Sequence, residues 1–251
     1  MNLTRAYEGP ARRIRCRRRE SVSSEGFCRD CAVQSRAFCS VLDNDALAKL
    51  EGLHSFRDLA PEESLFMEGD TAASFFTVLK GCLRLSKLLP DGRRQIIGFV
   101  VPGEFIGLSS EAGHVYNAEA LVEASLCRFA IGDLERIAEE NPAMKGRLLD
   151  MTNANLGRAH EHMLLLGRMR ALEKIASFLC NLIVRAAAAD LPSEPLALPM
   201  SRADIADYLG LTIETVSRTF TRLKTSSIIA LPEHNRVEVI DMAGLLLLAE
   251  G

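Results

Sequence analysis

The chain has no apolar stretch long enough to cross a membrane, and it lacks the apolar core of a secretory leader. A spanning helix needs about 20 mainly apolar residues, whereas this chain opens with a basic segment that contains ARRIRCRRRE at 11–20. We therefore expect a cytoplasmic protein that does not enter a membrane. Because the cytoplasm keeps thiols reduced, the seven cysteines are better interpreted as metal ligands, reactive thiols or core residues than as a disulfide framework.

An excess of positive charge is also missing. The formal net charge is -3 at pH 7, so any affinity for nucleic acid has to come from a local basic surface. The five histidines are scattered along the chain, and no nucleophile, base and orienting group stand together in the pattern of a catalytic site. We expect that the protein is not an enzyme.

The chain does have enough apolar residues, 48% of 251, to bury one or two cores. Its composition divides it into four segments. These are a disordered basic tail at 1–27, a cysteine loop with a β-roll sensor domain at 28–140, a long helix at 141–170, and a winged helix-turn-helix domain at 171–251. For the tail, a solvated segment is a better interpretation than a specific nucleic-acid arm.

Short apolar runs separated by turn signals fill the region from about 56 to 130. Four glycines punctuate it at intervals of 11 or 12 residues, namely Gly69, Gly81, Gly92 and Gly103. This spacing is typical of an antiparallel β-sandwich or roll. The tripeptide Pro90-Asp91-Gly92 lies between two such runs and predicts a hairpin tip, since proline fixes φ and glycine permits a positive φ.

A long helix is predicted next, with Asn141 as its cap and Pro142 in its first turn. Within it, apolar or small residues occupy the a and d positions of three heptads, namely Leu149, Leu156 and Met163 at one position and Thr152, Ala159 and Leu166 at the other. So narrow a stripe favours pairing with a second copy of the chain. Packing of the stripe against the β domain is the alternative.

Two short helices with a tight turn between them are predicted near the C-terminus. Ser201 and Asp204 form a capping box, Gly210 ends the first helix, and Thr212 caps the second. In the second helix we expect a buried stripe made of Ile213, Val216, Phe220 and Leu223. The strand-like runs SIIAL and RVEVI that follow would add a β-hairpin, as in a winged helix-turn-helix.

The opposite face of that second helix suits the major groove of DNA. It carries Glu214, Ser217, Arg218, Thr221 and Arg222. Arginine can bind guanine in a bidentate manner, glutamate can accept from cytosine, and serine can meet a phosphate or a base edge. A solvated amphipathic helix would explain any one of these residues, but not the helix pair with its wing. We therefore predict DNA binding through Thr212, Glu214, Ser217, Arg218 and Arg222.

Three cysteines near the N-terminus have the spacing C-x2-C-x7-C, namely Cys28, Cys31 and Cys39, and Cys127 lies far from them in an apolar run. Four thiolates suit either a 4Fe-4S cluster or a tetrahedral zinc ion, and the spacing does not decide between them. Either metal group would tie the N-terminal loop to the β domain. An isolated cysteine in an apolar strand is otherwise a small core residue.

These motifs resemble those of the Crp/Fnr family of bacterial transcription regulators, in particular its Fnr/FixK-type oxygen-responsive branch. The resemblance covers about 28–245 and depends on ETVSR at 214–218 within GLTIETVSR, on the cysteine trio, and on Cys127 within ALVEASLCRF. It implies that Glu214, Ser217 and Arg218 read palindromic TTGAT-type half-sites. It also implies that Cys28, Cys31, Cys39 and Cys127 hold an oxygen-labile 4Fe-4S cluster, whereas Cys16, Cys82 and Cys180 are not ligands.

The family resemblance also raises cyclic-nucleotide binding, which the sequence does not support. Gly103 and Glu104 begin a segment like a phosphate-binding cassette, but no arginine follows around 114–119. A buried phosphate without a cationic partner is costly. Binding of a cyclic nucleotide is therefore not expected.

The expected fold is α+β, with an N-terminal β-roll like that of cyclic-nucleotide-binding domains, a long dimerisation helix and a C-terminal winged helix-turn-helix. The expected function is an oxygen-responsive activator in which the cluster favours the homodimer, and the dimer binds double-stranded DNA and RNA polymerase, in part through the hairpin tip at 89–93. Three alternatives remain open. They are a zinc-stapled regulator, a FixK-like regulator whose cysteines have no role, and a thiol-redox enzyme that uses Cys28 and Cys31, although the loop lacks the βαβ setting of such enzymes.

Overall fold

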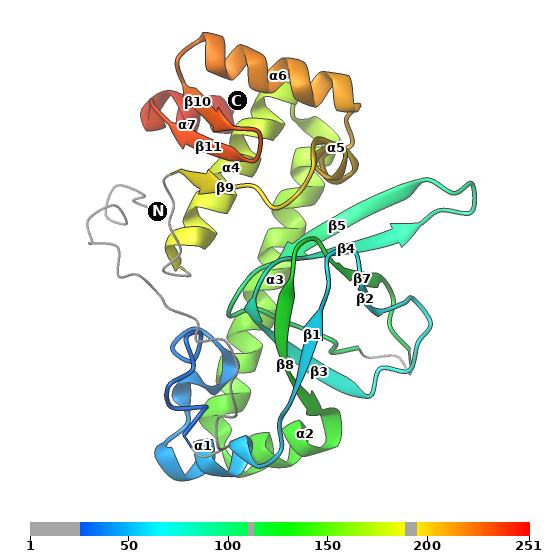
Figure 1. Ribbon diagram of the computed structural model, residues 1–251, viewed down its shortest axis with the longest axis vertical. Coiled ribbons are helices and arrows are strands. Elements are labelled where there is room, and N and C mark those ends of the chain that lie inside the picture. Colours follow the sequence, from blue (N-terminus) through cyan, green and yellow to red (C-terminus); the bar gives the residue numbers. More distant parts are fainter. Residues whose placement is uncertain (1–25, 110–112, 189–194) are drawn as a thin grey trace. The chain divides into compact units, whose positions relative to one another are not determined.

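The computed structural model describes residues 26–109, 113–188 and 195–251, which form two compact units (Figure 1). One unit contains 26–92 and 97–157, and the other contains 93–96 and 158–251. The predicted basic tail at 1–27 lies outside the described residues except for Gly26 and Phe27. No helix in the described ranges combines the length and the hydropathy needed to cross a bilayer.

The first unit contains the predicted antiparallel β-roll. Two four-stranded sheets have the strand orders β1-β8-β3-β6 and β2-β7-β4-β5. The strands are β1 (Ser55–Leu59), β2 (Ser64–Phe66), β3 (Ser74–Lys80), β4 (Leu83–Leu88), β5 (Arg94–Val100), β6 (Phe105–Ile106), β7 (Asn117–Ala120) and β8 (Ala124–Ala130). The predicted hairpin tip joins β4 to β5, where Gly92 has φ 83° and donates its N–H to the Leu89 carbonyl at 2.9 Å.

Strand β3 is buried on both of its faces, which explains its almost continuous apolar sequence. Phe76 and Val78 face the core between the sheets, whereas Phe75 belongs to a second apolar cluster that also contains Phe129 of β8. Successive side chains of a strand point to opposite faces, so Thr77 shares the face of Phe75. This outer face is the one that the N-terminal loop covers.

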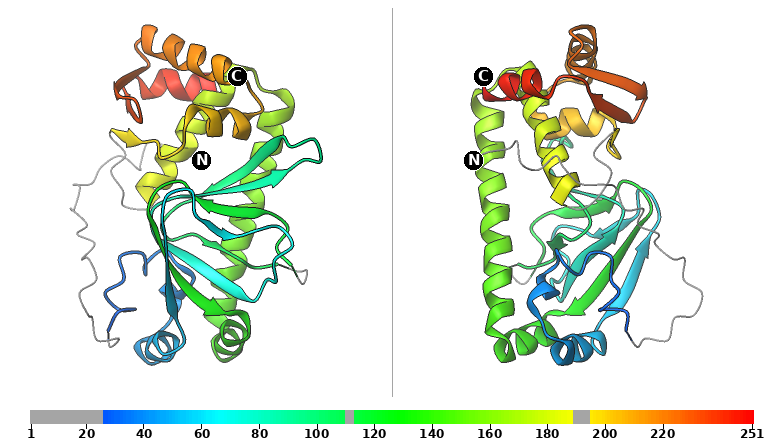
Figure 2. Two further views of the ribbon diagram at one scale, coloured as in Figure 1. Left: turned by 45° about the vertical axis from the view of Figure 1, so that its right-hand side comes forward. Right: turned by 90° about the vertical axis from the view of Figure 1, so that its left-hand side faces the viewer.

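Two helices and the start of a third complete the second cluster. Helices α1 (Asn44–Glu51) and α2 (Ile131–Glu140) lie side by side at one end of the β-roll (Figure 2). The sequence did not predict α2, which buries Leu134, Ile137 and Ala138 on one face. Asn141 directly precedes the third helix, as predicted, and its carbonyl accepts from the Met144 N–H at 2.9 Å. Its side-chain amide donates to the Ile137 carbonyl at 2.8 Å and closes the end of α2.

The third helix, α3 (Pro142–Arg168), begins at the predicted proline. One side of it packs on the second cluster through Met144, Leu148 and Met151. The heptad residues Leu149, Leu156 and Met163 are 61%, 53% and 60% exposed. The described part of the chain therefore does not cover this stripe, and packing against the β domain is not its role. Leu166 differs, because it is partly buried within the second unit.

The second unit contains the predicted winged helix-turn-helix. Its elements are α4 (Ala171–Ala188), β9 (Leu196–Ala197), α5 (Arg202–Leu209), α6 (Ile213–Thr225), β10 (Ile229–Glu233), β11 (Arg236–Val239) and α7 (Met242–Glu250). The wing is a three-stranded sheet with the order β10-β11-β9. The segment 191–199 lies between α4 and α5. Its first four residues lie outside the described ranges, but Leu196 and Ala197 pair with β11 and form a strand.

Buried polar contacts join the end of α3 to the end of α5. Lys174 of α4 is only 7% exposed, and its ammonium donates to the Leu209 carbonyl at 2.9 Å and to the Leu166 carbonyl at 3.3 Å. It thus satisfies carbonyl groups at two helix ends that have no partner inside their helices. His162 stacks on Tyr208 with ring centroids 4.0 Å apart, and its Nε2 donates to the Tyr208 carbonyl at 2.8 Å.

These contacts predict that acid destabilises the second unit. Burial lowers the pKa of His162, the charge of Lys174 lowers it further, and the bond to Tyr208 only partly opposes this shift. Below pH about 6.5 the unfolded chain therefore binds more protons than the folded chain. The free energy of unfolding then decreases as the pH decreases. Urea unfolding at pH 7.5 and at pH 5.5 measures this effect. Between these two pH values, the free energy of unfolding should decrease less for His162→Gln than for the parent.

The matched control is His160→Gln, because His160 is exposed on the same helix. This variant should keep the pH dependence of the parent. If His162→Gln keeps it as well, His162 is not the group that makes the unit sensitive to acid.

Candidate functional site

Both helices of the helix-turn-helix begin at the predicted residues, and the first ends at the predicted glycine. The Ser201 hydroxyl accepts from the Asp204 N–H at 3.1 Å, and the Asp204 carboxylate accepts from the Ser201 N–H at 2.9 Å. Gly210 ends α5 in the left-handed conformation, with φ 61°. Thr212 caps α6, since its hydroxyl accepts from the Thr215 N–H at 3.2 Å. A turn of three residues therefore sets the start of α6.

The buried stripe of α6 differs from the prediction at one position. Val216, Phe220 and Leu223 are buried as expected, but Ile213 is 48% exposed and Thr219 is buried in its place. Ile213 is the first residue of the helix. Burial of Thr219 is tolerated because its hydroxyl donates to the Thr215 carbonyl at 2.7 Å.

The face of α6 that the sequence assigned to DNA is fully exposed. Its residues are Glu214, Ser217, Arg218, Thr221 and Arg222. Hydrogen bonds from the backbone N–H of Glu214 and from the Thr212 hydroxyl lower the pKa of the Glu214 carboxyl group, and nearby Arg218 adds to the shift. Glu214 is thus held as an anionic acceptor at the start of the helix. Thr212 is also exposed, and its hydroxyl oxygen caps the helix and so helps to position α6.

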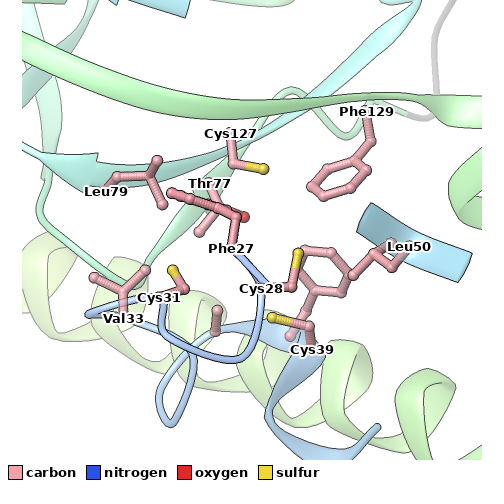
Figure 3. A pocket seen from close by; sticks show the side chains of 12 residues that line it. Phe27, Cys28, Cys31, Val33, Cys39, Leu50, Thr77, Leu79, Cys127 and Phe129 are labelled. Carbon is pink, nitrogen blue, oxygen red and sulfur yellow. The ribbon is translucent and has the colours of Figure 1, made fainter. Parts of the chain in front are cut away.

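A second site is the small cavity of about 20 Å³ that all four predicted sulfur ligands line. Cys28, Cys31 and Cys39 come from the N-terminal loop, and Cys127 comes from β8 (Figure 3). Tertiary structure therefore brings together residues that lie about a hundred positions apart in the sequence. The remaining lining side chains are apolar except for Thr77, and they are Phe27, Val33, Ala37, Phe38, Leu50, Thr77, Leu79 and Phe129.

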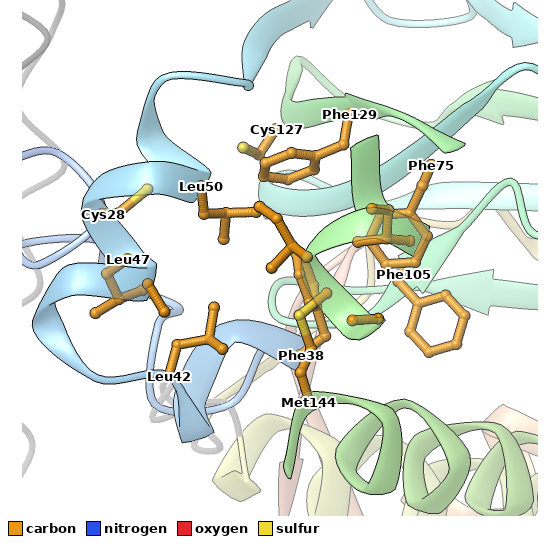
Figure 4. Packing of buried hydrophobic residues seen from close by; sticks show 14 residues of the cluster. Cys28, Phe38, Leu42, Leu47, Leu50, Phe75, Phe105, Cys127, Phe129 and Met144 are labelled. Carbon is orange, nitrogen blue, oxygen red and sulfur yellow. The ribbon is translucent and has the colours of Figure 1, made fainter. Parts of the chain in front are cut away.

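The loop that carries three of the cysteines consists of turns. The Asp30 N–H donates to the Gly26 carbonyl at 3.2 Å and the Gln34 N–H donates to the Cys31 carbonyl at 3.0 Å, and a 3₁₀ helix spans Phe38–Val41. The loop is packed as part of the core. Cys28 and Cys127 lie in one apolar cluster with Phe38, Leu50, Phe75, Phe129 and Met144 (Figure 4).

Two hydrogen bonds hold this loop in place. The Phe27 N–H donates to a carboxylate oxygen of Glu51 at 2.7 Å, which fixes the start of the loop to α1. The guanidinium of Arg147 donates to the Arg36 carbonyl at 2.8 Å, which ties the loop to α3. The sequence did not indicate either contact, because both join segments that are far apart in the chain.

The cavity favours the protonated form of its thiols. Burial raises the pKa of Cys28 and of Cys39 to about 12, and the neighbouring thiols contribute to both shifts. The negative charge of Glu51 adds to the shift of Cys28. Burial and the three loop cysteines also raise the pKa of Cys127. Four thiolates are therefore stable together here only if a positively charged group lies among them.

The thiol positions do not converge on one point. Within the described ranges, no three histidine, cysteine, aspartate or glutamate side chains are placed to hold a single metal ion. The four cavity cysteines form no disulfide among the described residues. Cys82, buried in the β-roll, and Cys180, partly buried in α4, do not line the cavity, and Cys16 lies outside the described residues.

Thr77 is a cavity residue that sequence reasoning missed. It is 3% exposed, and its Oγ1 has no hydrogen-bond partner among the described residues. It stands directly opposite Cys127 in the pairing of β3 with β8. A signal was present, since Thr77 is the one polar residue in the apolar run 75–79.

The cassette-like segment of the β-roll contains no cation. Residues 103–121 include neither arginine nor lysine, and the Glu104 carboxylate accepts from the Val101 N–H at 3.1 Å within its own turn. The expectation that no cyclic nucleotide binds stays a prediction.

Comparison with known protein families gives two matches. Residues 56–141 match the cyclic nucleotide-binding domain, and residues 173–248 match the Crp-like helix-turn-helix domain. The first match describes the fold of the β-roll, and the second covers the helix pair and the wing.

Similar proteins cover nearly the whole chain. The nitrogen fixation regulation protein FixK of Bradyrhizobium diazoefficiens is 44% identical over 223 residues, which are 89% of this chain and 94% of the relative. The transcriptional activator protein FnrL of Cereibacter sphaeroides is 38% identical over 87% of this chain and 90% of its own length. The structure of FixK2 from Bradyrhizobium japonicum superposes with a TM-score of 0.73 at 36% identity, over 78% of this chain and 97% of that one.

The relatives are transcription regulators and not enzymes, which agrees with the prediction from sequence. The chain therefore belongs to the Crp/Fnr family, as a transcriptional activator with a helix-turn-helix DNA-binding domain.

Proposed function

We propose that this activator is controlled by an oxygen-labile 4Fe-4S cluster held by Cys28, Cys31, Cys39 and Cys127. The observation that carries the proposal is that these four cysteines, from two distant segments, line one apolar cavity. Thiolates are the usual ligands of such clusters, and an apolar surround limits access of solvent.

The residues fit a cluster better than a zinc ion. Zinc has no redox chemistry, so a zinc ion bound by these cysteines would give the protein no response to oxygen. In a 4Fe-4S cluster each thiolate binds a different iron, so the four sulfurs surround the group and do not meet. The cavity of about 20 Å³ holds little more than a water molecule. The fit therefore rests on the donor set.

When bound, the cluster would supply a redox-reactive centre that zinc cannot supply. The chain's own residues then connect the site to α3. Phe38 of the cysteine loop and Met144 of α3 lie in the same apolar cluster, and Arg147 binds the loop carbonyl of Arg36. A loop that is tied to β8 through Cys127 thus supports the first turns of α3. Such coupling shifts the equilibrium between monomer and dimer only by the difference in the cluster's affinity for the two forms.

The state favoured in this way is a homodimer formed through α3. Leu149, Leu156 and Met163 repeat every seven residues and are exposed in the single chain. Burial of apolar side chains against a second copy removes this surface from water. Thr152 and Ala159 at the other seam position are exposed and small or polar, so the pairing is weak enough to be regulated.

The dimer presents two copies of α6 to a palindromic site of TTGAT type. Half-sites one helical turn apart require recognition helices about 34 Å from each other. Glu214, Ser217 and Arg218 read bases, and Arg222 supports the contact with DNA. The exposed hairpin tip at 89–93 is a contact for RNA polymerase.

The cluster is tested by isolating the protein without oxygen. We expect visible absorption with about four iron and four sulfide per chain, and loss of absorption, of the dimer and of DNA binding in air. Cys127→Ala should lack all three properties, whereas Cys180→Ala, which alters a cysteine outside the cavity, should keep them. Colourless protein that binds DNA equally in air contradicts the proposal and leaves a zinc-stapled or FixK-like regulator.

The dimer is tested by placing a charge in the seam. Leu156→Lys should shift sedimentation from dimer to monomer and lower affinity for a palindrome at least about tenfold, because a buried unpaired ammonium is costly. The control is Leu247→Lys, since Leu247 is 72% exposed but lies on α7. If the α3 variant remains dimeric, the seam lies elsewhere.

The base-reading role is tested with Arg218→Ala. Loss of a bidentate contact should cost about 1–3 kcal/mol of binding free energy at the cognate site and relax discrimination at one base pair. Lys145→Ala, on the exposed part of α3, should leave affinity and discrimination unchanged. Uniform weakening across all sequences would instead identify Arg218 as a phosphate contact.

A further inference from the structure

Thr77 has a feature that the packing of the β-roll does not explain. Its hydroxyl oxygen is buried, lies in the cysteine cavity, and has no hydrogen-bond partner among the described residues. Removing a hydroxyl from water without a new hydrogen bond destabilises the folded chain. A valine has nearly the same shape and would avoid this cost. The hydroxyl at this position is therefore a candidate for binding something other than the protein.

The position of Thr77 limits what it can bind. Thr77 pairs directly with Cys127 across β3 and β8, and side chains opposite each other in a sheet lie about 4.5–5.5 Å apart at Cβ. Figure 3 shows the Thr77 side chain among the cavity residues, on the side of Cys127. The other lining side chains are hydrocarbon or sulfur. A partner for the hydroxyl must therefore enter the cavity.

We propose that the Thr77 hydroxyl donates a hydrogen bond to a sulfur atom of the group that the four cysteines bind, and so helps to hold that group in the cavity. This inference rests on the proposed function and adds a residue to the site that is not a metal ligand. Hydrogen bonds to sulfur are among the means by which a protein tunes an iron-sulfur cluster. Thr77 is thus a positioning residue, which acts through the bound group and does not ligate iron.

The inference predicts effects of opposite sign on the two forms of the full-length protein. In the metal-free form, Thr77→Val removes a buried hydroxyl that has no partner. Its unfolding equilibrium should then shift about tenfold toward the folded state. In the form loaded with iron and sulfide without oxygen, the same variant should release iron to a chelator about tenfold faster than the parent. Thr77→Ser keeps the hydroxyl and should restore slow release.

The matched control is Ser74→Ala, which removes a second buried hydroxyl from the same strand. The Ser74 hydroxyl already accepts from Arg128 Nε at 3.0 Å, so its loss should destabilise the metal-free form. A Thr77→Val variant that is also less stable without metal would show that Thr77 already has a partner, such as a bound water, and would overturn the inference.

The loaded form separates this inference from the proposed function. Equal release rates for parent and Thr77→Val would overturn the role of Thr77 and leave the cluster in place. A parent that takes up no iron and sulfide would overturn the proposed function itself. Faster release from Thr77→Val, with slow release from Thr77→Ser, would support both.

Discussion

The pairing of β3 with β8 is the constraint on which the rest of the sensor unit depends. It aligns Thr77 with Cys127 and Phe75 with Phe129 on one face of the sheet, while Phe76 and Val78 fill the core on the other. A shift of the register by one residue would move each set of side chains to the opposite face of the sheet. The same ladder that builds the apolar core therefore presents a thiol and a hydroxyl to the N-terminal loop.

The N-terminal loop that carries three of the cysteines is part of the apolar core. Cys28 and Phe38 are buried with residues from α1, α2 and the start of α3, and Arg147 binds a loop carbonyl. Packed side chains therefore connect the cysteines to α3, whose heptad residues are exposed. In the proposed function, binding at the cysteines and pairing of chains are linked in both directions by thermodynamic necessity.

The helix-turn-helix shows how local signals place a recognition surface. Capping residues and a left-handed glycine fix the two helices within a few residues of chain, which is why Glu214, Ser217 and Arg218 could be assigned to one exposed face from the sequence. The prediction was wrong at Ile213, the first residue of the helix, which is exposed. Lys174, which joins two helix ends, carried no local signal.

The sequence by itself determined the β-roll, the long helix, the winged helix-turn-helix and the spacing of Cys28, Cys31 and Cys39, because caps, turns and periodicity act between residues that are near in the chain. Only the tertiary structure decided that Cys127 lines one cavity with the other three cysteines. It also decided that the Thr77 hydroxyl has no hydrogen-bond partner among the described residues, and that Leu196 and Ala197 form a third wing strand. These outcomes depend on strand register and on which faces become buried. Such pairings join distant residues and leave no periodic trace in the sequence.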